Sequence, residues 1–383
     1  MNKVKKLIRS EGFNNATSSL LAILIGLAFG FVILLLSEPS KALSGFLIIL
    51  QGGFSTGAKG IGQVLYFATP LILTGLSVGF AFKTGLFNIG APGQFIMGAF
   101  AAVYIGVKWT FLPAPFHWIV ALIGAAIVGG LWALIPGILK AYYNVHEVIS
   151  TIMMNYIGMY LCNMLVKLTI YDSNKSLSQN CAVSADLPKW GLDKIFSNTI
   201  GTYRDISTVN IGIIIAILVA ILMYIVLNKT IFGYELKACG FNENASKYAG
   251  INEKRNIILS MVISGGLAGF GGGLLYLSGA NGRHIKVVDV LATEGFNGIP
   301  VALLGLSNPI GIIFSAIFIS YLTLGGNYLQ TLNFMPEIID IIIACIIYFS
   351  AFALFLRSLL PKMIRKREDK SKKSSDKVYG GDK

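Results

Sequence analysis

Charged side chains are scarce in this sequence. Only 13% of the 383 residues are Asp, Glu, Lys or Arg, whereas 55% are hydrophobic, and the mean hydropathy is +0.70. A soluble domain of this length does not bury that much apolar surface in one core. The composition therefore excludes an ordinary soluble protein and predicts an integral membrane protein.

Reactive side chains are also rare. The three histidines fall in separate places, and no H-E-x-x-H or G-x-S-x-G spacing occurs. The four cysteines suggest neither a disulfide nor a metal site. They are Cys162, Cys181, Cys239 and Cys345. The sequence thus predicts no catalytic centre, no bound metal and no cofactor.

A complete phosphate-binding loop is missing as well. The nearest stretch is "GGFSTGAKG", in which Ala58 separates Gly57 from Lys59 and no Ser or Thr follows the lysine. The pattern G-x-x-x-x-G-K-[ST] is not met, so the chain is not expected to hydrolyse ATP itself.

Ionisable residues are few within the apolar runs, and those present lie near the predicted ends of spans. They are Glu147, Asp289, Glu294, Glu337 and Asp340. Ion-coupled transporters place such groups deep in the membrane, where they mark the pathway. The pattern therefore disfavours a secondary transporter.

Long apolar runs dominate what is present. Several approach the roughly 20 residues that a helix needs to cross a bilayer. The predicted spans, about ten in all, are 18–36, 61–82, 94–107, 117–139, 148–168, 209–227, 257–277, 295–306, 309–324 and 336–356. We expect an all-α transmembrane domain over 18–356. The third and eighth runs are too short for straight crossings, so they are expected to be broken or half-crossing elements.

Basic residues predict the orientation. They are in excess in the N-terminal arm (1–17), in the tail (357–383) and in the loop at about 229–256, which are expected in the cytoplasm. The loop at about 169–207 is balanced and is expected outside. Because the net charge of +13 lies mostly in the two termini, it points to anionic lipid near a disordered tail and not to nucleic acid.

Two stretches interrupt the apolar runs with Gly, Pro and Asn. They are "GLFNIGAPGQ" (85–94) and "EGFNGIPVALLG" (294–305). Breaks at membrane depth leave backbone groups that lipid cannot satisfy, and paired breaks in two halves indicate a substrate route. The alternative is that Gly and Pro only let helices pack closely.

The basic loop contains "YELKACGFNENASKYAGINEKRN" (234–256). It predicts a short helix from about Asn244 to Tyr248, with Gly240 and Gly250 as stops on either side. Such a helix could dock into a groove of a partner, or the segment could be an ordinary surface loop.

Four blocks together resemble the permease subunit of bacterial ABC importers for nucleosides and simple sugars. They are "GLFNIGAPGQFIMGAF", "NVHEVISTIMMNYI", "ELKACGFNENASKYAGINEKRNIILSMVISGGLAGFGGGL" and "GFNGIPVALLGLSNPIGI". The resemblance covers roughly residues 60–355 and is greatest to nucleoside permeases, which carry an N-I-G-x-x-G-Q block. Pro92 departs from the acidic residue usual in that block.

The resemblance implies a cobalamin-importer-like (type II) fold with two inverted halves, in a multi-pass protein of the bacterial cell membrane. It implies ABC ATPase subunits, a second permease subunit (identical or different) and an extracytoplasmic substrate-binding protein as partners. The coupling helix for the ATPases would be formed by Gly240, Phe241, Asn242, Asn244, Ala245, Tyr248, Ala249, Gly250 and Ile251.

The expected function is alternating access for nucleosides, with simple sugars such as ribose or galactosides as the runner-up. The candidate residues lining the path are Phe87, Asn88, Gln94, Asn155, Phe296 and Asn297. For the amides, interhelical hydrogen bonds are an equally good interpretation. For the phenylalanines, packing is the more common role.

Overall fold

The computed structural model describes residues 11–200, 203–278 and 284–335, and also residues 337, 341, 342, 344, 345, 348 and 349. The predicted tail (357–383), residues 1–10 of the arm and much of the tenth predicted span (336–356) lie outside the described residues. The long helices are α2 (Glu11–Ser37), α4 (Gly57–Lys83), α5 (Ala91–Lys108), α6 (Phe116–Tyr143), α7 (Glu147–Thr169), α9 (Gly212–Lys229), α12 (Glu253–Tyr276) and α14 (Pro309–Asn327). The described chain is therefore mostly helical, as predicted.

Six segments are long and apolar enough to cross a membrane, judged by length and composition among the described residues. They are 42–83, 116–143, 147–169, 212–229, 253–276 and 309–332. Helix α5 and the short α13 (Thr293–Leu304) do not meet this measure, and α2 contributes only the shorter apolar stretch Ile23–Ser37. The structure thus supports a multi-pass helical membrane protein, while the number of about ten spans stays a prediction.

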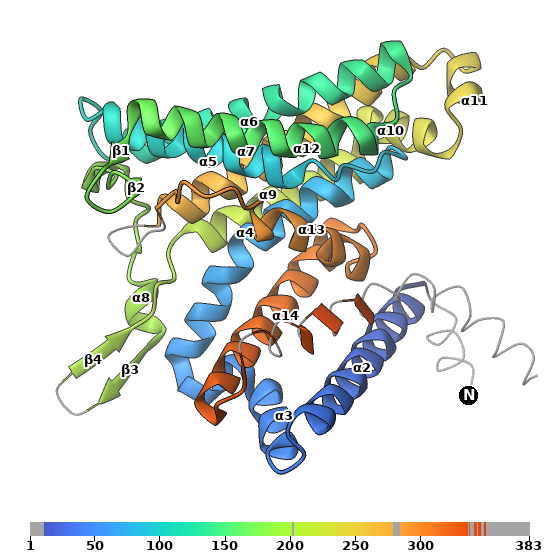
Figure 1. Cartoon of the computed structure of the whole chain (residues 1–383). Coiled ribbons are helices and arrows are strands. Elements are labelled where there is room, and N and C mark those ends of the chain that lie inside the picture. The colour runs from blue at the N-terminus through green and yellow to red at the C-terminus, as the bar shows by residue number, and fades with distance from the viewer. Residues whose placement is uncertain are drawn as a thin grey trace, which may run out of the picture.

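Helix α12 forms the centre of the larger helix group and packs against α4, α5 and α6 (Figure 1). Glycines make these contacts unusually close. A Cβ on Gly98 of α5 would lie 2.3 Å from the Cα of Gly269, and one on Gly129 of α6 would lie 2.5 Å from the carbonyl oxygen of Gly265. The helices therefore meet backbone to backbone, as small residues allow in membrane proteins.

A second packing region joins the chain's first helices to α14. Helix α3 (Ala42–Gln51), which the sequence did not predict, leads through the 3-10 turn η1 (Gly52–Thr56) into α4. Leu34, Ile49 and Leu322 pack together in a separate apolar cluster. Another 3-10 turn, η3 (Tyr328–Leu332), follows α14. Figure 1 shows α2 and α3 beside α14, away from α6 and α7.

The 169–207 segment, predicted only as a loop, contains two antiparallel hairpins. The first joins β1 (Tyr171–Asp172) to β2 (Leu177–Ser178), and the second joins β3 (Ser197–Ile200) to β4 (Tyr203–Ile206). The 3-10 turn η2 (Val183–Ala185) and the short helix α8 (Leu192–Ile195) connect them. Figure 1 places these elements at the opposite end of the molecule from α11 (Glu243–Tyr248).

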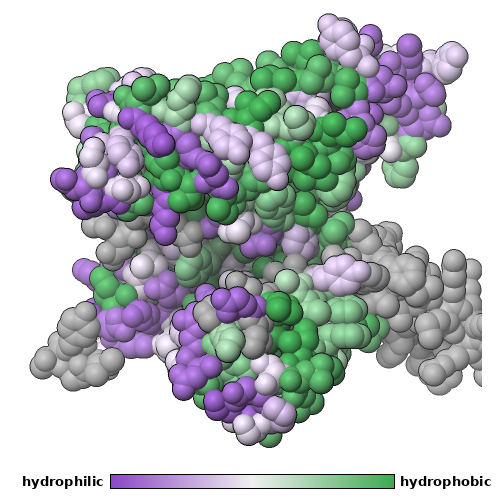
Figure 2. All heavy atoms as spheres, viewed as in Figure 1, coloured by the Kyte–Doolittle hydropathy of each residue, from purple (hydrophilic) through white to green (hydrophobic). Residues whose placement is uncertain are grey.

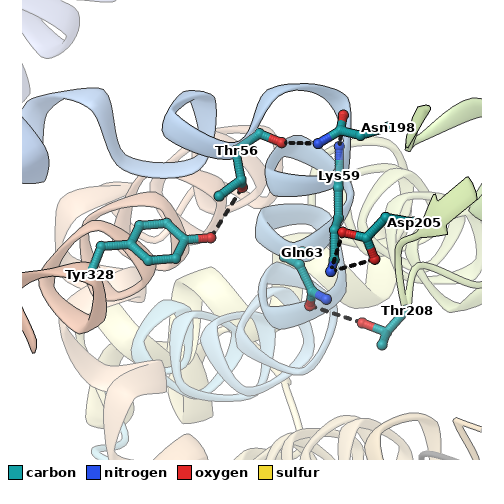
Figure 3. Close-up of polar contacts among 7 residues, drawn as sticks. All are labelled: Thr56, Lys59, Gln63, Asn198, Asp205, Thr208 and Tyr328. Atoms are coloured by element: carbon teal, nitrogen blue, oxygen red, sulfur yellow. Dashed lines mark hydrogen bonds and ion pairs between the residues drawn. The ribbon is translucent and has the colours of Figure 1, made fainter. Parts of the chain in front are cut away.

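Polar contacts fasten the β3–β4 hairpin to the start of α4 (Figure 3). The Lys59 ammonium lies 2.7 Å from an oxygen of Asp205, and the Thr208 hydroxyl donates to Gln63 at 2.9 Å. The Asn198 amide donates to the carbonyl oxygen of Thr56. These polar side-chain contacts therefore hold the hairpin against the start of α4.

Candidate functional site

The "GLFNIGAPGQ" stretch is a true interruption of the helices. Helix α4 ends at Lys83, residues 84–90 form a connection without helix, and α5 begins at Ala91. Gly85 has a φ of +75°, a conformation that suits glycine, and Pro92 lies in the first turn of α5, where its missing N–H costs nothing. We call residues 84–90 the α4–α5 connection.

Two predicted path residues, Asn88 and Gln94, bond to each other across this connection. The Asn88 amide donates to Gln94 Oε1 at 2.8 Å and to Ser264 Oγ of α12 at 2.7 Å, and Gln94 Nε2 donates to Asn88 Oδ1 at 3.1 Å. Both side chains are buried. Their amides therefore tie the connection to α12.

Asn155 of α7 joins the same region from the other side. Its Oδ1 accepts the backbone N–H of Gly93 at 2.8 Å, and its Nδ2 donates to the carbonyl oxygen of Ile89 at 3.0 Å. The side chain is 1% exposed. The three amides thus make the interhelical hydrogen bonds that the sequence left open as an alternative. Contact with cargo stays a prediction for each.

The structure brings the two interrupted stretches together. Gly295 at the start of α13 faces Pro92, and a Cβ there would lie 2.4 Å from the Cα of Pro92. However, "EGFNGIPVALLG" is not a second break, since α13 runs from Thr293 to Leu304 with Pro300 inside it. The expectation of paired breaks is therefore wrong for the second stretch, in which the backbone stays helical.

The aromatic candidates lie differently. Phe87 stacks on Phe82, with ring centroids 5.1 Å apart, so it packs as expected. Phe296 is 38% exposed. Asn297 is half-buried and makes no side-chain hydrogen bond to another described residue. These two are the candidates of α13 that remain accessible.

The predicted short helix in the basic loop is present as α11, one residue longer than predicted. Asn242 caps it by accepting the N–H of Ala245 at 3.0 Å, and Gly250 follows it with a φ of +82°. The expected stop at Gly240 is wrong, because α10 (Ile231–Phe241) continues through that residue. Asn242 ends α10 and begins α11. We call residues 231–251 the α10–α11 segment.

Large side chains of the α10–α11 segment are exposed. Phe241 is 91% exposed and Tyr248 is 94% exposed. Between the two helices lies a groove of about 570 Å³, lined by Ile231, Tyr234, Glu235, Ala238, Phe241, Asn242, Ala245, Ser246, Ala249 and Ile251. Asn244 lies on the exposed surface outside this lining. The segment thus offers a surface for a partner.

The α10–α11 segment also contacts the α4–α5 connection, which the sequence analysis did not predict. A Cβ on Gly240 would lie 2.6 Å from the carbonyl oxygen of Lys83 and 2.9 Å from the amide nitrogen of Gly85. Gly85 and Gly240 lie in two separate sequence blocks, and nothing in the sequence indicates that these two glycines contact each other. A continuous set of contacts therefore runs from the exposed α11 to the buried amides.

An ion pair fixes the start of α7. Glu147 Oε2 lies 3.1 Å from the Lys140 ammonium of α6, and the Glu147 side chain is 11% exposed. A negative charge in the first turn of a helix is favourable. Among the described residues, no three His, Cys, Asp or Glu side chains are grouped to hold a metal.

Comparisons with known proteins agree with this architecture. Residues 60–351 match the family described as the permease component of the branched-chain amino acid transport system. The chain is 40% identical over 348 residues to a guanosine ABC transporter permease protein of Bacillus subtilis (strain 168), covering 91% of this chain and 96% of the relative. It is 35% identical over 373 residues to a nucleoside ABC transporter permease protein of Lactococcus lactis subsp. cremoris (strain MG1363), covering 95% and 100%.

A more distant relative is a glucose ABC transporter permease protein of Haloferax volcanii, 30% identical over 297 residues, which cover 77% of this chain and 76% of the relative. No solved structure matches the chain. Because the family match spans most of the sequence and the first two relatives align over nearly their whole length, the protein belongs to this family of ABC transporter permease components.

Proposed function

We propose that the protein is the membrane-spanning subunit of an ATP-driven importer for nucleosides. The observation that carries this proposal is the 40% identity, over 91% of the chain, to a permease named for guanosine transport. The relative at 35% identity is also named for nucleosides. Nucleosides are therefore the cargo class that the relatives favour.

The α10–α11 segment is the proposed docking site for ABC ATPase subunits. Its aromatic side chains, such as Phe241 and Tyr248, are almost fully exposed, and its groove is lined by small residues such as Ala245 and Ala249. Exposed aromatic anchors beside a groove are typical of protein interfaces. The missing phosphate loop fits a subunit that relies on a partner for ATP hydrolysis.

The orientation of the proposal follows from charge. The basic 229–256 segment would face the cytoplasm with both termini, and the balanced 169–207 segment would face outward, where a substrate-binding protein delivers cargo. Their places at opposite ends of the molecule in Figure 1 support this arrangement. A second permease, of the same or a different kind, would complete the path between two subunits.

The proposed mechanism is alternating access. ATP-driven closure of the ATPases would move α11, and the contact between Gly240 and the α4–α5 connection would carry that movement to Asn88 and its partners. Because Asn88 and Gln94 bond to each other in this structure, opening the path would exchange those bonds for bonds to cargo or water. Weak polar contacts of that kind let cargo leave again.

Simple sugars are the second candidate cargo. The specific observation in their favour is the 30% identity to a glucose permease over 77% of the chain. The lower identity and shorter coverage rank this candidate second.

Uptake in cells that lack the gene tests the proposal. Radiolabelled guanosine would be offered with and without a plasmid copy, while unlabelled adenosine, cytidine and ribose compete in turn. We expect plasmid-dependent uptake that nucleosides block and ribose does not. Plasmid-dependent uptake of ribose alone would move the protein to the sugar candidate.

A further inference from the structure

The exposed faces of two helices indicate how this protein meets lipid. Between residues 119 and 138 of α6, and between residues 214 and 225 of α9, every exposed side chain is Ile or Leu. In α6 they are Ile119, Ile123, Ile127, Leu131, Ile135 and Ile138, and in α9 they are Ile214, Leu218, Ile221, Leu222 and Ile225. Purely aliphatic surfaces are what hydrocarbon chains accept without cost.

Helix α7 has a different exposed face. Tyr156, Tyr160 and Lys167, with Met153 and Met164, recur at helical spacing along one stripe, beside the exposed aliphatic residues Ile149, Ile152, Ile157 and Leu168. Tyr156 and Tyr160 are 49% and 56% exposed, and Met153 and Met164 are 59% and 51% exposed. Figure 2 shows hydrophilic residues gathered over α7, among the green of its neighbours. The part of α7 that carries Tyr160 and Lys167 therefore offers polar groups that the exposed faces of α6 and α9 lack.

A polar cavity lies beside the C-terminal end of α7, the end from which the chain continues into the 171–207 segment. It has a volume of about 380 Å³ and is lined by Tyr160, Asn163, Met164, Lys167, Val287, Val288 and Asp289. Binding sites for small molecules begin at about 300 Å³. The cavity therefore has room for one small ligand.

The wall opposite α7 is fixed. The Ile285 N–H donates to Ser178 Oγ at 3.0 Å, and the Ser178 N–H donates to the Ile285 carbonyl oxygen at 3.0 Å. Asn163 Nδ2 donates to Asp289 Oδ1 at 2.9 Å and to the carbonyl oxygen of Val288 at 3.0 Å. The Asp289 carboxylate is thus held at the cavity and keeps its second oxygen for a ligand.

We propose that this cavity is a nucleoside-binding pocket of the permease, the first contact of cargo after it leaves the binding protein. This inference rests on the proposed function and adds a site to it. The second oxygen of Asp289 accepts a ribose hydroxyl, the Tyr160 ring stacks on the base, and Asn163 Oδ1 and the Lys167 ammonium meet polar atoms of the base edge. Within the described residues, the Lys167 ammonium forms no ion pair and the Tyr160 hydroxyl forms no hydrogen bond.

The combination of groups favours a nucleoside over the other cargo class. A carboxylate and an amide alone would serve a free sugar as well. The exposed Tyr160 ring and the neighbouring Met164 form a flat apolar surface, on which a nucleobase can stack but which a free sugar covers only in part. Because the pocket is open on one side, it surrounds only part of a nucleoside and binds it weakly. Weak binding lets the nucleoside leave the pocket and move on along the path.

Photolabelling of the purified permease–ATPase complex in lipid nanodiscs tests the pocket. The probe is 8-azidoguanosine, and labelled residues are mapped by mass spectrometry of peptides. We expect label in the peptides around Tyr160 and Asp289, at least fivefold reduced by excess guanosine and unchanged by the same concentration of ribose. Tyr160→Leu and Asp289→Asn should each reduce the label at least fivefold.

Matched variants control for general damage. Tyr156→Leu makes the same change one turn away on the same stripe, outside the cavity lining, and Asp193→Asn makes the same change at a carboxylate of the 171–207 segment that is also outside the lining. Both should label as the unmodified complex does. Basal ATP hydrolysis by the two control complexes should be unchanged, which shows that their assembly is intact.

The outcomes separate the pocket from the proposed function. Label elsewhere, or label that Tyr160→Leu does not reduce, overturns the pocket, and equal displacement by ribose overturns base stacking. Guanosine uptake by the unmodified protein is measured in parallel. If uptake occurs without label in these peptides, the pocket is wrong while the importer stands; if neither nucleoside uptake nor label occurs, both fail.

Discussion

Gly240 of α10 packs directly on Gly85 of the α4–α5 connection. A Cβ on Gly85 would lie 3.1 Å from the Cα of Gly240, so the two backbones touch. This contact joins α10, which leads through Asn242 into α11, to the connection that carries Asn88. It makes Gly240 the position where coupling is most easily tested.

Replacing Gly240 by Leu should abolish uptake while the protein stays in the membrane. The side chain would force α10 away from the end of α4, because the carbonyl oxygen of Lys83 stands 2.6 Å from its Cβ. Uptake and membrane abundance are measured together. As a control, Ser173→Leu introduces the same side chain at an exposed position outside the α10–α11 segment. Normal uptake by the Gly240 variant would contradict the coupling role of this contact.

The effect of replacing Gly250 should depend on the backbone conformation that the new residue can adopt and not on the room available for its side chain. Its φ is +82°, and nothing lies within 4 Å of an added Cβ. Asn tolerates this region, whereas a β-branched residue is strained there. We expect Gly250→Asn to keep most of the uptake and Gly250→Val to lose it. Equal loss in both variants would show that the bare surface of glycine is needed by a partner.

The Asn88 network should contribute measurably to stability. Asn88→Leu leaves the Gln94 amide and the Gly90 N–H without their partner in a buried place, at a cost of about 1–3 kcal/mol, while Ser264 keeps its bond to Ser77. Thermal unfolding of the purified protein checks this. Ser320→Ala is the control, since Ser320 Oγ is buried with no hydrogen-bond partner among the described residues and its removal should be neutral or slightly stabilising.

The ion pair between Lys59 and Asp205 should matter locally. Both side chains are about one-third exposed, at 31% and 29%, so the pair is worth at most about 1 kcal/mol. Asp205→Asn should leave the midpoint of thermal unfolding almost unchanged but speed proteolysis within the β3–β4 hairpin. The double variant with Lys59→Met should be no worse than either single change. Strong global destabilisation would argue that the hairpin carries more of the fold than its contacts indicate.

Cys181 should resist alkylation. Burial, together with the charge of Asp186, raises the pKa of its thiol to about 12. At pH 8 only about one thiol in 10⁴ is then ionised, against about a quarter for an ordinary cysteine. Iodoacetamide should therefore react about 10³ times more slowly with Cys181 than with a cysteine placed at exposed Ser173, and about tenfold faster for each unit of rising pH. Fast labelling at pH 8 would show that the 181–186 turn opens often.

Much of the helical framework could be predicted because apolar runs of about 20 residues indicate membrane-spanning helices directly. The start of α5 follows from Gly90 and Pro92, and α11 follows from the polar residues between its flanking turns. The stop at Gly240 could not be predicted correctly from the chain alone. Glycine signals either a helix end or a close approach of two backbones, and only the tertiary contact with Lys83 decides between them.

The candidate site was predictable in its parts but not in its arrangement. Asn88, Gln94 and Asn155 were identified because polar side chains are unusual in apolar runs. The bonds of Asn88 to Ser264 and of Asn155 to Gly93 and Ile89 require the α4–α5 connection, α5, α7 and α12 to meet at one place, which no local pattern encodes. The cavity beside Tyr160 was missed for the same reason, since Asp289 reaches it from a segment more than 100 positions further along the chain.

The glycine contacts of α12 have a mechanical consequence. Where Gly98 meets Gly269 and Gly129 meets Gly265, no flexible side chain separates the two backbones. Interlocked main chains resist sliding, because each step along the interface must pass over a neighbouring carbonyl group. A force applied at one end of α12 should therefore rotate α5, α6 and α12 together as one rigid body, so that a displacement at one end of the group is transmitted to the other end without loss.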